Sequence, residues 1–111
     1  MDYYEIWVNL VPGTNDMEFS RCVRAYLDHL VAQGDMDSYT FRRRKLGFGP
    51  DGLGEFNVTL KFRSLAHIDE AFFDVAKRSG ETEKLHHEVY SKVKDFKAGL
   101  YRDYPDPVRE E

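Results

Sequence analysis

The sequence predicts a single α+β domain in which strands and helices follow one another in the order βαββαβ. Apolar residues recur at every second position near the N-terminus and again in residues 55–63, which is typical of strands with two different faces. In residues 19–30 they recur at steps of three and four, which is typical of an amphipathic helix. Glycine and proline separate these segments. A length of 111 residues leaves room for one domain, 1–111, with one hydrophobic core.

The first strand and the first helix have clear boundaries in the sequence. The strand is predicted from its alternating apolar residues, Tyr4, Ile6, Val8 and Leu10. Pro12 and Gly13 end it. Asn15 is predicted to cap the N-terminus of the helix, with Glu18 completing a capping box, and Gly34 stands where a C-terminal cap is expected. The helix presents one apolar stripe, made of Phe19, Val23, Tyr26, Leu27 and Leu30.

The second strand, predicted over residues 38–48, is less regular than the first. Tyr39 and Phe41 share one parity. Leu46 and Phe48 share the other, so we expect a change of register, such as a β-bulge, in the basic stretch between the two pairs.

The remaining elements follow in the order that completes the pattern. A regular strand is predicted over residues 55–63, and a helical region opens at Ser64 as its N-cap. Ser79-Gly80 breaks this region, and a short helix over residues 81–92 leads to the last strand, 93–102. The residues that the second helical region is expected to bury are Leu65, Ile68, Phe72 and Val75 or Ala76.

This element order is the ferredoxin-like one, and it predicts a four-stranded antiparallel sheet with the helices on one face. The other face, called the open face below, is expected to carry Tyr3, Glu5, Trp7, Asn9, Asn57, Thr59, Lys97 and Tyr101. Arg42 and Arg44 are expected at the side of the open face, because burying two arginines under the helices would be costly. Large aromatic and hydrogen-bonding side chains together favour a covered face over a solvated one.

Three stretches of the chain resemble a known family. Residues 4–10, 43–50 and 100–107 are similar to a family of uncharacterised bacterial proteins that includes dimeric ferredoxin-like proteins from marine sources. The wider group that the chain resembles is the dimeric α+β barrel superfamily, in which two such sheets pack face to face. The resemblance therefore implies a homodimer. It also implies an organic-ligand pocket beside the sheet, since the superfamily includes small monooxygenases, haem-degrading enzymes, lactone isomerases and stress-responsive proteins.

Three functions remain open from the sequence. The first is a homodimer that binds a small, partly apolar organic molecule, an organic acid included, either between sheet and helices or where two sheets meet. Its candidate ligand-binding residues are Trp7, Asn9, Arg42, Arg44, Asn57, Thr59 and Tyr101. The second is a cofactor-independent monooxygenase or isomerase, with Glu5 or His86 carrying the proton. The third is a structural dimer without a ligand.

Other classes of function find no support. Sixteen basic against 20 acidic residues give a formal net charge of −4, which argues against a nucleic-acid partner. The longest apolar runs are only a few residues, so we expect no membrane-spanning segment. Cys22 is the one cysteine and cannot form an internal disulfide, which favours the cytoplasm.

No metal or cofactor is expected either. His86 and His87 are adjacent, so on a helix they point about 100° apart and do not form a chelate. Residues 47–52 match the pattern G-x-G-x-x-G of dinucleotide-binding proteins. Because a strand follows this stretch where the binding motif needs a helix, we expect a hairpin loop there.

Overall fold

The computed structural model describes residues 1–77 and 80–105 of the chain. Ser79 of the predicted break and the residues after Pro105 lie outside the described part. The elements in chain order are β1 (Asp2–Leu10), α1 (Asp16–Ala32), β2 (Ser38–Arg43), β3 (Phe56–Phe62), α2 (Leu65–Ala76), α3 (Gly80–Tyr90) and β4 (Val93–Arg102). None of the helices in these residues is long and apolar enough to cross a membrane.

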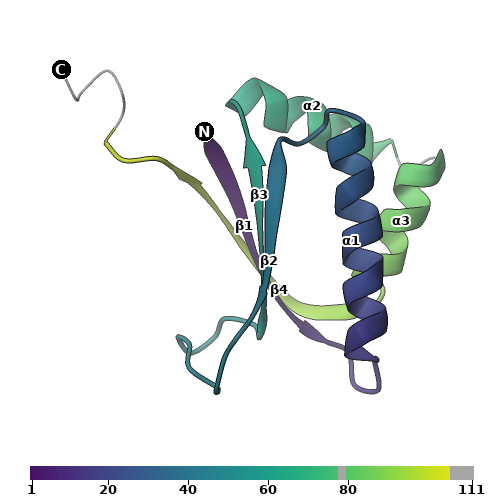
Figure 1. Ribbon diagram of the computed structural model, residues 1–111, viewed down its shortest axis with the longest axis vertical. Coiled ribbons are helices and arrows are strands. Elements are labelled where there is room, and N and C mark those ends of the chain that lie inside the picture. The colour runs from purple at the N-terminus through teal and green to yellow at the C-terminus, as the bar shows by residue number, and fades with distance from the viewer. Residues whose placement is uncertain (78–79, 106–111) are drawn as a thin grey trace.

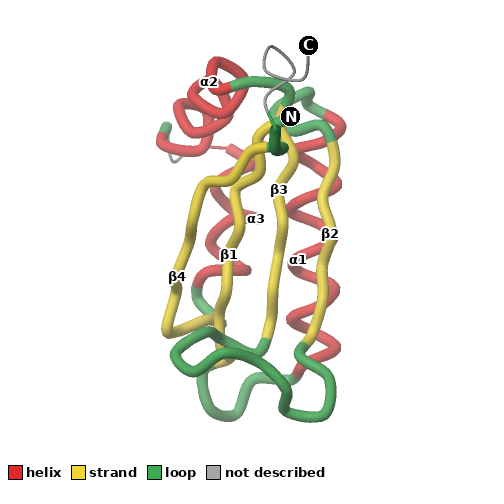
Figure 2. Tube along the Cα trace, turned by 90° about the vertical axis from the view of Figure 1, so that its left-hand side faces the viewer, coloured by secondary structure: helices red, strands yellow, loops and turns green. Residues whose placement is uncertain are grey.

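The strands form one antiparallel sheet in the order β2-β3-β1-β4. In the middle of the sheet Ile6 lies opposite Val58 of β3 and Ala98 of β4. All three helices lie on the same side of the sheet, with α1 running alongside it and α2 towards one end (Figures 1 and 2). The predicted ferredoxin-like α+β fold is therefore confirmed.

Alternation along the strands separates a core face from the open face. The buried side chains of the core come from β1, α1, β3 and α2 and from the turn before β2: Val8, Phe19, Val23, Leu27, Leu30, Met36, Phe56, Val58, Leu60, Phe62, Ile68 and Ala71. Two edge-to-face ring pairs join α1 to the sheet, Phe19 with Phe41 at 5.8 Å and Phe19 with Phe56 at 5.2 Å between ring centroids. The stripe predicted for α1 thus packs on the sheet as expected.

The N-caps predicted at Asn15 and Ser64 are present. The side-chain oxygen of Asn15 accepts a hydrogen bond of 2.9 Å from the backbone N–H of Glu18. Ser64 caps α2 in the same way, accepting from His67 N–H at 3.3 Å. Gly34 follows α1 with φ of 81°, a conformation that favours glycine.

The prediction for residues 38–48 was wrong in its second half. β2 ends at Arg43, whose guanidinium contacts Glu55 at 2.7 Å and Asp16 at 3.0 Å. Residues 44–55 form a loop in which Leu46 is 83% and Phe48 is 81% exposed. The parity change in the sequence therefore marks the end of the strand. The irregularity lies in β4 instead, where an extra residue bulges near Asp95, which has φ of 58°.

The buried side of α2 also differs from the prediction. Leu65 and Phe72 are 62% and 45% exposed, whereas His67 is only 5% exposed. The His67 ring accepts a hydrogen bond from the backbone N–H of Arg63 at Nδ1 (3.3 Å), and Nε2 lies 2.7 Å from the carbonyl oxygen of Gly34. Because these bonds hold His67 inside, the helix is rotated so that Leu65 turns outwards and Phe72 lies at the margin of the buried side.

Candidate functional site: a cavity between sheet and helices

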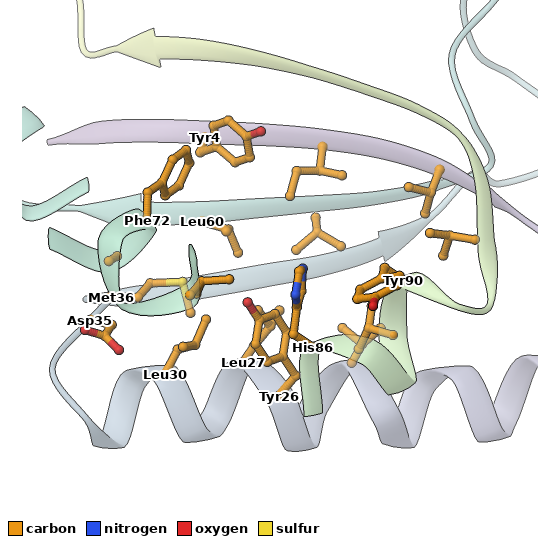
Figure 3. Close-up of a pocket in the computed structure, with 18 of the residues that line it drawn as sticks. Tyr4, Tyr26, Leu27, Leu30, Asp35, Met36, Leu60, Phe72, His86 and Tyr90 are labelled. Carbon is orange, nitrogen blue, oxygen red and sulfur yellow. The ribbon is translucent and has the colours of Figure 1, made fainter. Parts of the chain in front are cut away.

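A cavity of about 450 Å³ separates the sheet from the helices (Figure 3). Its walls come from every strand except β2 and from all three helices. The non-aromatic apolar residues in its lining include Ile6, Val23, Leu27, Leu30, Met36, Val58, Leu60, Ala71, Val75 and Val89. A volume of this size lies within the range of small-molecule pockets, about 300–1,000 Å³.

The cavity reaches the surface beside the edge strand β4. Phe72 of α2 and Phe96 of β4 both line it, and they are 45% and 56% exposed. The ring of Phe72 meets Tyr4 of β1 edge to face, with 5.2 Å between the ring centroids. The rotation of α2 described above places Phe72 here, so aromatic side chains form the rim through which a ligand could enter.

Asp35 is a carboxylate at one end of the cavity. It follows α1, is 7% exposed, and one of its oxygens, Oδ2, has no hydrogen-bond partner among the described residues. Burial raises the pKa of the Asp35 carboxyl to about 6, and the neighbouring Asp74 acts in the same direction. The nearby His67 and His29 oppose this shift without cancelling it.

His86 of α3 is the nitrogen-bearing side chain of the lining. Its ring points from α3 towards the sheet (Figure 3) and lies between Tyr26 and Tyr90, at centroid distances of 5.3 Å and 4.8 Å. Nδ1 of His86 lies 3.6 Å from Oε2 of Glu83, one helical turn earlier. Both of these atoms are buried and neither has a hydrogen-bond partner among the described residues. Burial, followed by the negative charge of Glu83, raises the pKa of Tyr26 well above its ordinary value, so its hydroxyl stays protonated.

The predicted ligand-binding residues on the strands lie on the other side of the sheet. In the strand register Trp7 is opposite Asn57 and Lys97, and Tyr3 is opposite Tyr101. Residues opposite each other on neighbouring strands share a face. Trp7, Asn9, Asn57, Thr59 and Tyr101 therefore lie on the open face as predicted, and none of them lines the cavity.

Several polar side chains of the open face already bind one another. The carboxylate of Glu5 accepts hydrogen bonds from Asn57 Nδ2 at 2.7 Å and from Thr59 Oγ1 at 2.9 Å. Asn9 accepts from the backbone N–H of Glu55 at 2.9 Å, and its amide donates to Asp95 at 3.1 Å. Glu5 is thus held by its neighbours on the face away from the cavity. Of the two residues proposed as proton carriers, His86 is the one that lines the cavity.

The two predicted arginines are in different places. Arg42 is exposed and lies opposite Asn57, on the open face. Arg44 is not on that face, because it lies in the loop and its guanidinium donates hydrogen bonds to the carbonyl oxygens of Leu53, at 2.7 Å, and Pro50, at 3.5 Å. Arg44 thus holds the loop together, and the structure does not join it to the other candidates.

The described residues contain no cluster of three metal-ligating side chains. Cys22 of α1 is half-buried. Residues 47–52, which match the glycine-rich pattern, lie in the loop between β2 and β3.

Comparison with known proteins assigns the family. The family model described as a family of unknown function, DUF6614, matches residues 1–111. The chain belongs to this family. No match is found among the curated proteins.

Solved structures with the same fold are distant in sequence from this DUF6614 member. A protein of Arabidopsis thaliana has a TM-score of 0.74 at 7% identity, covering 96% of this chain and 98% of its own. A mutant of SnoaB, a cofactor-independent oxygenase from Streptomyces nogalater, has a TM-score of 0.69 at 8% identity, with coverages of 96% and 95%. A dimeric ferredoxin-like protein of unknown function from Jannaschia sp. CCS1 has a TM-score of 0.67 at 7% identity, with coverages of 92% and 98%. At identities this low, the TM-scores show a shared fold and nothing more.

Sequence reasoning missed most of the cavity. Its apolar residues have the same pattern as an ordinary core, so nothing distinguishes a wall from a packed interior. One sequence feature pointed to the cavity: His86 lies three residues before Val89 on a helix, so both are on the side of the helix that faces the core.

Proposed function

We propose that this DUF6614 protein is a cytoplasmic homodimer that binds a small, partly apolar organic molecule in the cavity between its sheet and its helices. The observation that carries the proposal is the cavity itself, with about 450 Å³ of space and a lining that is almost wholly apolar. Without a ligand these apolar walls would face water that enters at the rim, and a bound apolar molecule would remove that surface from water.

The open face is the proposed interface with the second copy of the chain. Trp7 and Tyr101 lie on it, and tryptophan and tyrosine are enriched at the energetic centres of interfaces. The loop 44–55 turns away from the helices to the same side of the sheet (Figure 1) and carries the exposed Leu46 and Phe48. A dimeric protein with the same fold, from Jannaschia sp. CCS1, agrees with this proposal.

The hydrogen bonds of the open face favour an interface there over a ligand site. Glu5, Asn57 and Thr59 are hydrogen-bonded to one another, which lowers the cost of burying them against a second sheet. A ligand bound at the same place would have to compete for groups that already have partners.

Ligand binding can be tested with the neutral fluorescent probe N-phenyl-1-naphthylamine, whose emission increases in an apolar environment. We expect the wild-type protein to bind it saturably. Ala71→Phe should abolish binding, because Ala71 is 4% exposed and lines the cavity. Ala66→Phe is the matched control, since Ala66 is exposed on the same helix.

Val75→Phe fills the same space from a half-buried position and serves if Ala71→Phe does not fold. Saturable binding that both cavity substitutions leave unchanged would refute the cavity as the site. Absence of any probe binding to the folded wild-type dimer would favour a structural dimer without a ligand.

A second candidate function is an enzyme, either a cofactor-independent monooxygenase or an isomerase. The observation that favours it is the position of His86 in the cavity wall with Glu83 behind it. One protein of the same fold, SnoaB, is a cofactor-independent oxygenase. Oxygen consumption with a panel of quinols, measured for wild type and His86→Leu, tests this candidate. Consumption that requires His86 supports it, and none across the panel counts against it.

A further inference from the structure

The charges around the cavity restrict what it can hold. Among the described residues, 1–77 and 80–105, no arginine or lysine lines it, and Asp35 is the one carboxylate in its wall. Glu83 adds a second carboxylate next to His86. A buried anion needs a cation or several hydrogen-bond donors nearby. The described lining therefore offers an organic acid no cationic partner, and Arg42, an exposed arginine on the open face, is on the far side of the sheet.

The position of His86 supplies one hydrogen-bond acceptor inside this apolar space. The carboxylate of Glu83 lies on the Nδ1 side of the ring and favours the tautomer with its hydrogen on Nδ1. In that tautomer Nε2 carries a free lone pair, and it belongs to the part of the ring that points towards the sheet (Figure 3). A ligand group that donates a hydrogen bond is the natural partner of this atom.

The side chains around His86 are aromatic. Tyr26 and Tyr90 lie on either side of the ring, and Phe72 and Phe96 line the way in from the surface. Aromatic rings favour stacked or edge-to-face contacts with other rings. The walls thus suit a planar molecule better than a flexible chain.

We infer that the cavity binds a neutral, planar, largely apolar molecule with one phenolic or enolic hydroxyl group, and that this hydroxyl donates a hydrogen bond to Nε2 of His86. The inference rests on the proposed function and specifies its ligand class. It involves no net transfer of atoms, because the proton is shared between the hydroxyl oxygen and the imidazole.

Three matched probes test the inference by displacement of bound N-phenyl-1-naphthylamine. 2-Naphthol has the hydroxyl, 2-methoxynaphthalene has the same rings without the donor, and 2-naphthoate has a negative charge. We expect 2-naphthol to bind about fivefold to tenfold more tightly than 2-methoxynaphthalene, which is the scale of one hydrogen bond. We expect 2-naphthoate to bind more weakly than either.

Substitutions of His86 test whether this side chain causes the preference for 2-naphthol over 2-methoxynaphthalene. His86→Leu should reduce the ratio of the two neutral affinities to about one, and His87→Leu should leave it unchanged, because His87 is exposed on the same helix. His86→Phe serves if the leucine variant does not fold. Equal binding of the two neutral probes to wild type, a preference that survives both His86 substitutions, or tightest binding of 2-naphthoate would overturn the inference. Failure of N-phenyl-1-naphthylamine itself to bind would instead refute the proposed function, so the two failures are distinguishable.

Discussion

Replacing Asp35 by asparagine should change how the stability of the protein depends on pH. The folded-state pKa of about 6 lies above the ordinary value of 3.8, so the fold favours the neutral carboxyl. The stabilising contribution of the neutral form is fully present below the ordinary value and is lost as the pH rises through about 6. The amide in the variant Asp35→Asn is neutral at every pH and has a similar shape, so the variant avoids this loss.

The magnitude follows from the shift. A rise from 3.8 to about 6 corresponds to at most about 3 kcal/mol. Because Asp74 beside it is only half-buried and water screens the pair, we expect about 1–2 kcal/mol. The free energy of unfolding of Asp35→Asn relative to wild type should therefore rise by this amount between pH 4 and pH 7.

Urea denaturation at a fixed protein concentration measures this difference, with loss of helical circular dichroism as the signal. Asp37→Asn, which removes an exposed carboxyl in the same turn, is the matched control. A difference for Asp35→Asn that stays constant from pH 4 to pH 7, or that falls, would refute the assignment of a raised pKa to Asp35.

Three further substitutions test other parts of the structure. Trp7→Ala should raise the dissociation constant of the homodimer by about thirtyfold or more, as loss of a central interface tryptophan does. Met17→Ala, on the exposed surface of α1, should leave the constant unchanged. Sedimentation equilibrium measures the constant for both variants. Leu27→Ala should lower the free energy of unfolding by about 2–5 kcal/mol, because Leu27 is 3% exposed in the core. A decrease below about 1 kcal/mol in urea denaturation would contradict this. Gly54→Ala should also destabilise the fold, since a Cβ there would clash with the backbone of Val8, and unchanged thermal unfolding would show that the loop can move aside.

Local patterns were enough to predict most of the fold. The alternation in β1 and β3, the caps at Asn15 and Ser64 and the bounds of β4, though not its bulge, depend on residues close in sequence. The end of β2 was not predictable in the same way. Arg43 finds its partner Asp16 on α1, which is distant along the chain, and only the folded structure brings them together.

The candidate site was harder to predict because it depends on packing. The residues of the open face could be placed from their parity alone, but parity does not show that Glu5 already binds Asn57 and Thr59. The rotation of α2 depends on the two hydrogen bonds of His67, one of which goes to the distant Gly34. That rotation places Phe72 at the cavity rim, so the entrance could not be found without the tertiary structure.

Methyl NMR distinguishes a ligand site in the cavity from one on the open face. The cavity wall contains many methyl groups, including those of Val23, Leu27, Leu30, Val75 and Val89, whereas Trp7 and Thr59 report on the open face. On titration with 2-naphthol we expect saturable shifts of the cavity methyl signals with little change in the Trp7 indole and Thr59 methyl signals. Shifts confined to Trp7 and Thr59, with the cavity methyls unmoved, would contradict the account.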